Sequence, residues 1–361
     1  MEVENVERKK EMEEFIRNFQ DMPDRLLKYC EILLEGGEAS PFSYQDTMSY
    51  RRLAIELTTY CNLNCIWCYR HDPNFKHVLN KEIPIQKIKA MVANTKGKFR
   101  MVHFGGVGEP LLYSHLYEAI EEVKKLSSHI KITTNGTLLT KEKIDDMTRK
   151  GLTHIEISVD AFNEEENLEL RGSKLVTLIK NIKYISDENK LHLQINSVVS
   201  NLNHNSLKNA VEVLKECNNI NFLHLIPLFM TKQMKEKGID RISDEKFIDI
   251  LKKLDNDIKK YNLKWELHPS PYGVRLDPVI EMKRRRNICF DCFEDPYISI
   301  EGELLPCGRQ KIYGGADATV GFEKAWNHPK LLKFRKNMLT GNYPALCGKL
   351  CYLKERTEEI K

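Results

Sequence analysis

Three cysteines lie close together in the stretch TTYCNLNCIWCYR, as Cys61, Cys65 and Cys68. Thiolates at this spacing can share one metal ion or cluster. A structural zinc site takes four protein ligands, so a zinc site in this loop would lack one. A 4Fe–4S cluster held by three thiolates instead leaves one iron open to a small molecule. The loop is therefore predicted to hold a metal cluster that binds a second molecule.

A second set of cysteines falls in the C-terminal part of the chain. Its members are Cys289, Cys292, Cys307, Cys347 and Cys351. This set can supply the four ligands of one further 4Fe–4S cluster, with one cysteine left over. The C-x2-C pair followed by later cysteines also fits tetrahedral zinc, and the spacing taken alone favours zinc. The residues by themselves therefore predict a metal site and leave the metal open.

The elements that must position these cysteines follow a regular alternation. Six β-rich runs are predicted as strands, and a helical segment follows each of the first five. The strands are expected at 52–59, 101–106, 130–136, 154–160, 192–200 and 221–228, and the helices at 83–94, 114–128, 141–151, 174–189 and 206–216. This order predicts an α/β fold with a parallel sheet, a partial TIM-like (β/α)6 barrel. The first three cysteines follow the first strand, at the end of the sheet where such barrels bind ligands.

Four parts of the chain are distinguished by their patterns. Residues 1–50 are expected to form an N-terminal helical extension and 51–230 the partial barrel. Residues 231–285 read as a helical linker, and 286–361 as a small cysteine-rich α+β cap. In the cap, the sequence EGE between ISI and LLP predicts a hairpin that brings Cys292 and Cys307 together.

The three-cysteine loop carries a family resemblance. The pattern C-x3-C-x2-C after LTT resembles the signature of the radical S-adenosylmethionine (radical SAM) enzymes. In that family the open iron of a 4Fe–4S cluster chelates S-adenosylmethionine (SAM). The reduced cluster then cleaves SAM to methionine and a 5′-deoxyadenosyl radical, which takes a hydrogen atom from the substrate. The resemblance implies that Trp67, directly before the third cysteine, packs near the adenine; its other reading is a core aromatic residue.

The stretch HFGGVGEPLL after the second predicted strand is similar to the family's Gly-Gly-Glu-Pro segment. Gly108, Glu109 and Pro110 match it, and Val107 stands in place of the first glycine. The resemblance implies that Glu109 meets the amino group of SAM, since a carboxylate accepts strong hydrogen bonds from an ammonium group. The alternative is a glycine-rich turn that carries a surface glutamate.

Further matches follow the third and later strands. Ser158 and Asp160 match the family's serine-containing segment, and Arg171 stands where family members place an arginine facing the SAM carboxylate. Arginine suits that role because its donors form a planar fork. The resemblance also implies cofactor contacts for Asn135 and Leu225. Asn135 can equally mark a turn, and a core role is the other reading of the leucine.

The second cysteine set also carries a resemblance. The spacing from Cys292 to Gly302 and Cys307 resembles the start of the SPASM cap, or of its shorter relative the twitch domain. A full SPASM cap usually carries two clusters and more cysteines, so the resemblance implies one auxiliary 4Fe–4S cluster here. The isolated Cys30 and Cys217 are expected to behave as small apolar residues.

The resemblance implies an oxidoreductase. After hydrogen abstraction, an auxiliary cluster that accepts one electron would yield an oxidised product, whereas a thiol that returns a hydrogen would give epimerisation. The favoured reading is oxidation of a small molecule such as a sugar or cyclitol. The alternatives are a peptide- or protein-modifying enzyme, a relative of the GTP cyclase of molybdopterin synthesis, and a non-catalytic metal-stapled scaffold. A flavodoxin- or ferredoxin-type protein is the implied reductant.

Composition restricts the remaining classes. The 361-residue chain has a formal net charge of +4, and its basic residues lack interleaved aromatic platforms, so a nucleic-acid partner is not expected. The N-terminal sequence MEVENVERKKEMEEF has no apolar signal core, and no apolar run approaches the roughly 20 residues of a membrane span. These features predict a cytoplasmic protein.

Overall fold

The computed structural model describes residues 52–68, 70, 80–228, 230, 232–269, 292, 296–307 and 314–339. The predicted N-terminal extension, with Cys30, lies outside the described residues, as do Cys289, Cys347 and Cys351. Of the second cysteine set, the structure therefore describes Cys292 and Cys307.

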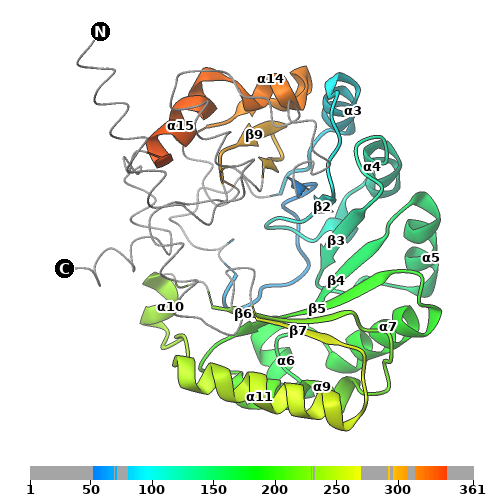
Figure 1. The fold of residues 1–361 in the computed structure, drawn as a ribbon, viewed down its shortest axis with the longest axis vertical. Coiled ribbons are helices and arrows are strands. Elements are labelled where there is room, and N and C mark those ends of the chain that lie inside the picture. The colour runs from blue at the N-terminus through cyan, green and yellow to red at the C-terminus, as the bar shows by residue number, and fades with distance from the viewer. Residues whose placement is uncertain are drawn as a thin grey trace.

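A single curved sheet organises the described part of the chain (Figure 1). Its strand order is β10-β9-β8-β1-β2-β3-β4-β5-β6-β7. The strands are β1 (Leu53–Ile55), β2 (Val102–Phe104), β3 (Ile130–Thr134), β4 (His154–Ser158), β5 (His192–Val199), β6 (Phe222–Pro227), β7 (Glu266–Pro269), β8 (Tyr297–Ile298), β9 (Glu303–Leu305) and β10 (Ala316–Asp317). All pairings from β8 through β1 to β7 are parallel, and the two pairings of β9 are antiparallel. The six predicted strands and the partial-barrel architecture are confirmed.

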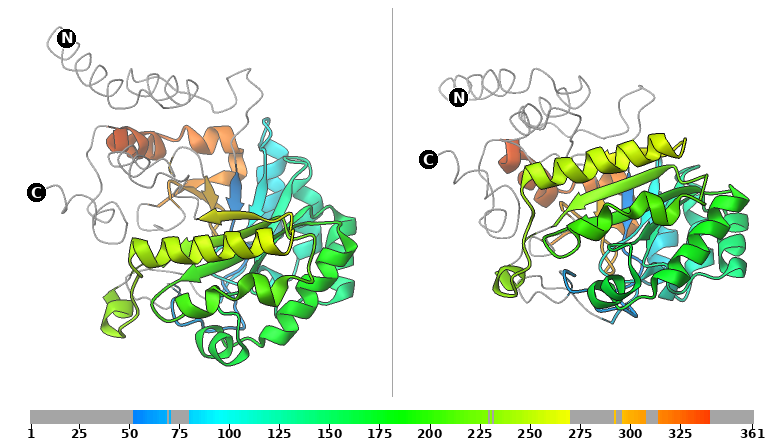
Figure 2. Two further views of the ribbon diagram at one scale, coloured as in Figure 1. Left: turned by 60° about the horizontal axis from the view of Figure 1, so that its bottom comes forward. Right: turned by 90° about the horizontal axis from the view of Figure 1, so that it is seen from below.

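Helices cover the convex side of this sheet (Figures 1 and 2). The helices of the described residues are α3 (Ile85–Asn94), α4 (Leu116–Val123), α5 (Lys141–Lys150), α6 (Glu164–Arg171), α7 (Leu175–Glu188), α8 (His204–Leu207), α9 (Ala210–Leu214), α10 (Lys232–Glu236), α11 (Asp244–Lys260), α14 (Phe322–Trp326) and α15 (Pro329–Leu339), with 3-10 turns η2 (Pro110–Leu112) and η4 (Ala318–Val320). The helix expected over 206–216 is divided into α8 and α9, and α6 was not expected. No helix among the described residues is long and apolar enough to cross a membrane.

The main core lies between the sheet and its helices. Alternate strand residues such as Ile155 and Ile157 are completely buried there, together with helix residues such as Ile120 and Ile182. This alternation is what a strand with one buried face requires, because successive side chains point to opposite faces. Full burial of each such side chain contributes about 1.5–3 kcal/mol.

The C-terminal strands belong to the same sheet as the barrel. Strand β8 pairs in parallel with β1, and the predicted hairpin is present as β8 and β9. At the opposite edge β7, within the predicted helical linker, pairs with β6. The helix α14 packs Phe322 edge-on against Phe99 of the barrel, with ring centroids 4.9 Å apart. The sheet thus runs unbroken past residues 230 and 286, and the division into four domains stays a prediction.

Candidate functional site

The three-cysteine loop follows β1 and is held in place by the end of α6. The backbone N–H of Ile66 donates to the carbonyl of Leu170 at 3.0 Å. The Cys65 thiol approaches the carbonyl of Arg171 at 3.8 Å. A helix far along the chain therefore sets the position of the loop. All three thiols remain partly exposed.

The thiols of this loop lie close enough to influence one another. Burial raises the pKa of Cys65 to about 11, Arg171 opposes the rise, and the charges of Cys68 and Cys61 add to it. Burial likewise raises the pKa of Cys68. Metal binding has to displace these protons, because the thiolate is the ligand. Among the described residues, no three His, Cys, Asp or Glu side chains are already placed to hold one metal ion.

Glu109 is buried, which excludes the alternative of a surface glutamate. Its carboxylate accepts hydrogen bonds from the backbone of Leu111 (3.1 Å), the hydroxyl of Thr134 (2.6 Å) and the backbone of Asn135 (2.7 Å). Burial raises the pKa of Glu109, and the bonds from Asn135 and Thr134 oppose this rise. The carboxylate is thereby fixed at the carboxyl end of β3.

Gly108 brings the loop after β2 onto the cysteine loop. A Cβ atom at this position would lie 2.2 Å from the carbonyl oxygen of Thr58 and 2.7 Å from that of Tyr60. Any side chain would therefore collide with backbone. The next residue, Glu109, donates its N–H to the Tyr60 carbonyl at 2.7 Å. The glycine is required for this close approach.

Asn135 connects β3 to the cysteine loop and also shapes a turn. Its side-chain NH2 donates to Asn62 Oδ1 at 2.9 Å, and its oxygen accepts the backbone N–H of Thr137 at 2.9 Å. Asn62 in turn donates to the Thr137 hydroxyl at 2.8 Å. Both readings of Asn135, as a turn residue and as part of the site, fit this geometry.

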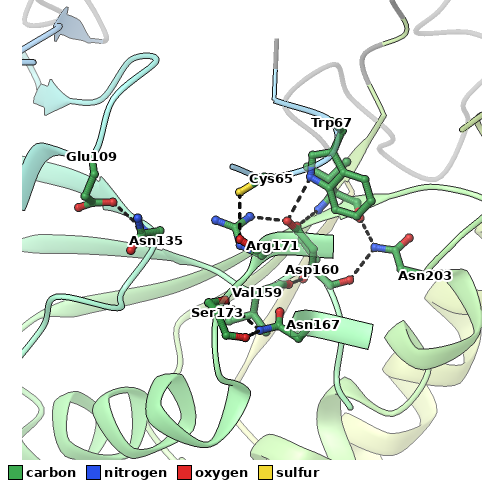
Figure 3. Close-up of polar contacts among 12 residues, drawn as sticks. Cys65, Trp67, Glu109, Asn135, Val159, Asp160, Asn167, Arg171, Ser173 and Asn203 are labelled. Carbon is green, nitrogen blue, oxygen red and sulfur yellow. Dashed lines mark hydrogen bonds and ion pairs between the residues drawn. The ribbon is translucent and has the colours of Figure 1, made fainter. Parts of the chain in front are cut away.

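Asp160 gathers the groups on the other side of the loop (Figure 3). Its Oδ2 accepts hydrogen bonds from Trp67 Nε1, at 3.2 Å, and from Arg171 Nη1. Its Oδ1 accepts the backbone N–H of Val198 at 2.7 Å, and its carbonyl accepts Asn203 Nδ2 at 2.6 Å. The acceptors of this buried residue are thus occupied by protein groups.

Arg171 is a buried cation with one hydrogen-bond donor still unused among the described residues. Burial works against its charge, but Asp160 and the Cys65 thiol outweigh that effect and raise the pKa of the guanidinium. Its buried Nε has no hydrogen-bond partner among the described residues. A buried donor left unpaired costs about 1–3 kcal/mol, so this N–H is suited to an anionic ligand.

Arg171 is the last residue of α6, the helix that the sequence analysis did not predict. Asn163 caps its start by accepting the backbone N–H of Glu166 at 2.8 Å. Gly172 ends it with a left-handed φ of 75°. These capping residues are the signal in the sequence that would have predicted the helix.

The other predicted site residues lie in different surroundings. Ser158 is partly exposed at the end of β4, and Leu225 is completely buried in the main core. Trp67 packs in a second, smaller core with Leu170 and is also hydrogen-bonded, so it is not a core residue alone. Cys292 is buried and Cys307 is partly exposed, and their meeting stays a prediction.

Cys217 behaves as an apolar residue, as expected. It is buried in the main core, and burial raises the pKa of its thiol to about 11. Sequence reasoning missed Asn62 and Asn203, because their partners lie far away in the chain and no local pattern marks them.

Comparisons with known proteins agree with this geometry. Residues 55–214 match the family described as the Radical SAM superfamily. A Methanocaldococcus jannaschii protein described as a probable GTP 3′,8-cyclase is 30% identical over 270 residues, which are 71% of this chain and 84% of that protein. The AdoMet-dependent heme synthase of Methanosarcina barkeri is 23% identical, over 86% of this chain and 90% of its own.

Solved structures share the fold. The crystal structure of Streptococcus suis SuiB bound to its precursor peptide SuiA superposes with a TM-score of 0.60 and 17% identity. The match covers 80% of this chain and 66% of SuiB. At this level of identity the likeness concerns the fold alone.

Proposed function

Since this chain belongs to the radical SAM superfamily, we propose that it is an enzyme that reductively cleaves SAM and abstracts a hydrogen atom from its substrate. The observation that carries the proposal is the convergence of three groups at one end of the sheet. They are the loop of three thiols, the buried carboxylate of Glu109 and the buried guanidinium of Arg171 with its unpaired Nε.

In this proposal Cys61, Cys65 and Cys68 hold a 4Fe–4S cluster, and their thiol donors suit iron–sulfur ligation. When bound, the cluster supplies the electron that cleaves SAM. Glu109 receives the ammonium group of SAM and Arg171 its carboxylate, by charge-assisted hydrogen bonds.

The remaining predicted residues position these groups or line the cofactor. Asp160 fixes Arg171 and Trp67 relative to the loop, because its acceptors are already filled by protein donors. Trp67 is assigned to the adenine, and Asn135 and Ser158 to the polar groups of SAM, whereas the complete burial of Leu225 in the main core favours its core role. A flavodoxin- or ferredoxin-type protein is the proposed reductant.

The proposed reaction is two-electron oxidation of a small polar molecule. One electron and one proton would leave as a hydrogen atom; the hydroxyl proton would then go to a base, and the second electron to one auxiliary 4Fe–4S cluster held by the C-terminal cysteines. A GTP-cyclase-like reaction is the second candidate, because the probable GTP 3′,8-cyclase shares 30% identity over 84% of its length. Peptide modification is the third, since SuiB was solved with a precursor peptide.

An anaerobic reconstitution tests the proposal. The protein is loaded with iron and sulfide, its iron is counted, and 5′-deoxyadenosine is measured after addition of SAM and dithionite. We expect about eight irons, falling to about four in a triple Cys→Ala variant of the loop that makes no 5′-deoxyadenosine. Consumption of GTP in the same assay would favour the second candidate. Bound zinc without SAM cleavage would refute the proposed function and leave the non-catalytic scaffold.

A further inference from the structure

The concave face of the sheet, opposite the helices, is lined by polar side chains. TIM-barrel interiors are usually filled by Val, Ile and Leu. Here strand alternation places another set on this face, most of it partly exposed: His103, Lys131, Thr133, Glu156, Gln194, Asn196 and His224. Such an interior is suited to a ligand that forms hydrogen bonds.

Within this set an imidazole, a hydroxyl and a carboxylate form a chain. His103 Nε2 lies 2.7 Å from the hydroxyl of Thr133, which donates to Glu156 Oε2 at 2.5 Å. Lys131 and Asn196 also donate to the Glu156 carboxylate, at 2.5 and 3.2 Å. A threonine hydroxyl has one proton, and here it goes to the carboxylate. The hydroxyl oxygen therefore accepts from the imidazole, which places the His103 proton on Nε2 and leaves Nδ1 as an acceptor.

His103 is neutral and its Nδ1 remains available. Burial lowers the pKa of His103 well below its usual value, with further lowering by Lys131 and Arg52 and an opposing effect of Glu156. No hydrogen bond to Nδ1 is present among the described residues, and this atom is not one of the fully buried unpaired atoms. A neutral imidazole with a free lone pair can accept a proton.

The glycine pair after β2 makes room for this group. A Cβ atom at Gly105 would lie 2.9 Å from both Cε1 and Nε2 of His103. A Cβ atom at Gly106 would lie 2.8 Å from Glu56 Cγ and 2.9 Å from the hydroxyl of Tyr297. The first two glycines of HFGGVGEP thus leave space for side chains of the barrel interior, whereas Gly108 serves the cysteine loop.

We propose that His103 is the base that accepts the hydroxyl proton of a small polyol substrate held on the concave face. This inference rests on the proposed function. The carbon bearing the hydroxyl first loses a hydrogen atom to the 5′-deoxyadenosyl radical. The resulting carbon radical then loses its hydroxyl proton to Nδ1 and one electron to the auxiliary 4Fe–4S cluster, and the carbonyl double bond forms. Glu156, linked to His103 through the Thr133 hydroxyl, partly offsets the effect of burial, Lys131 and Arg52 on the new imidazolium.

The proposal of a polyol substrate follows from the side chains next to His103, Thr133 and Glu156. Gln194 donates to Asn196 Oδ1 at 2.6 Å and lies 3.1 Å from Nδ1 of His224. Amides and imidazoles both donate and accept, as the several hydroxyls of a polyol require.

Labelling with diethyl pyrocarbonate, which acylates neutral imidazoles, tests the assignment on the full chain. Adducts at His103 are quantified by peptide mass mapping at pH 7.5 and 5.5, with N-acetylhistidine as an external reference. The reference should lose about tenfold in rate between these pH values, as expected for a pKa near 6.5. We expect His103 to react at both pH values with less than a twofold change. Absence of the adduct at pH 7.5, or a tenfold fall at pH 5.5, would overturn the inference.

Two variants sharpen this experiment. Lys131→Met removes one cation that opposes protonation of His103, while burial, the largest cause of the lowered pKa, remains. The ratio of His103 labelling at pH 5.5 to that at pH 7.5 should therefore not rise above the wild-type ratio, and a rise would contradict the electrostatic argument. His129→Gln changes an exposed histidine before β3 and is the control; it should leave both the labelling of His103 and the formation of 5′-deoxyadenosine unchanged. Loss of the His103 adduct in His129→Gln would show that the adduct does not report on His103 alone and would overturn the inference. Failure of both wild type and control to form 5′-deoxyadenosine would refute the proposed function while the labelling result stands by itself.

Discussion

Replacing Asp160 by asparagine should be unusually damaging for so small a change. The asparagine keeps one oxygen that can accept from the backbone N–H of Val198. It loses the negative charge, and its NH2 group would face the N–H donors of Trp67 and Arg171. Arg171 would remain buried without its counter-ion, and its Nε already lacks a partner in the described part of the chain. Removal of one partner of a buried ion pair costs about 3–5 kcal/mol. We expect Asp160→Asn to lower the free energy of unfolding by that amount.

Urea unfolding followed by circular dichroism measures this loss. Asp187→Asn on α7 is the matched control, because Asp187 pairs with Lys183 and the two side chains are 56% and 49% exposed. An exposed pair of this kind contributes at most about 1 kcal/mol. SAM binding by the reconstituted protein should weaken in Asp160→Asn and stay unchanged in Asp187→Asn. Equal, small losses of stability in both variants would show that Asp160 does not hold the site together.

Three further predictions concern other parts of the molecule. Gly108→Ala should abolish 5′-deoxyadenosine formation and lower the melting temperature, because its Cβ would lie 2.2 Å from a backbone oxygen. In Gly172→Ala the new Cβ meets no atom within 4 Å and only the left-handed backbone is strained, so this variant should lose some stability but keep more of the activity than Gly108→Ala. Asn203→Ala should cost about 2–4 kcal/mol in urea unfolding, since it leaves the carbonyls of Asp160 and Val198 without this donor; a loss below about 1 kcal/mol would contradict that role. Burial and the neighbouring His192 and His129 lower the pKa of His154 to about 4. The free energy of unfolding should therefore be highest above pH 6.5 and fall as the pH drops toward 4. His154→Gln should remove about 1–2 kcal/mol of this fall when urea unfolding is measured across the pH range, and an unchanged pH profile would contradict the prediction.

The strands were predictable from sequence because burial on the helix side imposes a period of two. The alternation of IKITT and HIEIS shows this pattern directly. Strand β8 has two residues, too few for any period, and it forms because β1 offers an edge. The helix α6 was missed because its sequence EEENLELR has few apolar residues, although its caps were visible.

The site was predictable where a local motif carries it. The cysteine loop and Gly108-Glu109 are contiguous stretches with fixed spacing. The role of Asp160 depends instead on Val198 and Asn203, which are 38 and 43 residues away in the chain. His103 was overlooked because its chemistry arises from Thr133 and Glu156 on two other strands. Contacts between strands of this kind leave no mark in a single sequence.

The pairing of β8 with β1 has a consequence for the timing of electron flow. Strand β1 leads into the three-cysteine loop, and β8 lies between Cys292 and Cys307 in the chain. A metal centre held by the C-terminal cysteines would therefore be tethered to its counterpart through backbone hydrogen bonds of one sheet. The gap between the two centres would not vary with a hinge motion, so electron transfer would be gated by substrate arrival and proton loss.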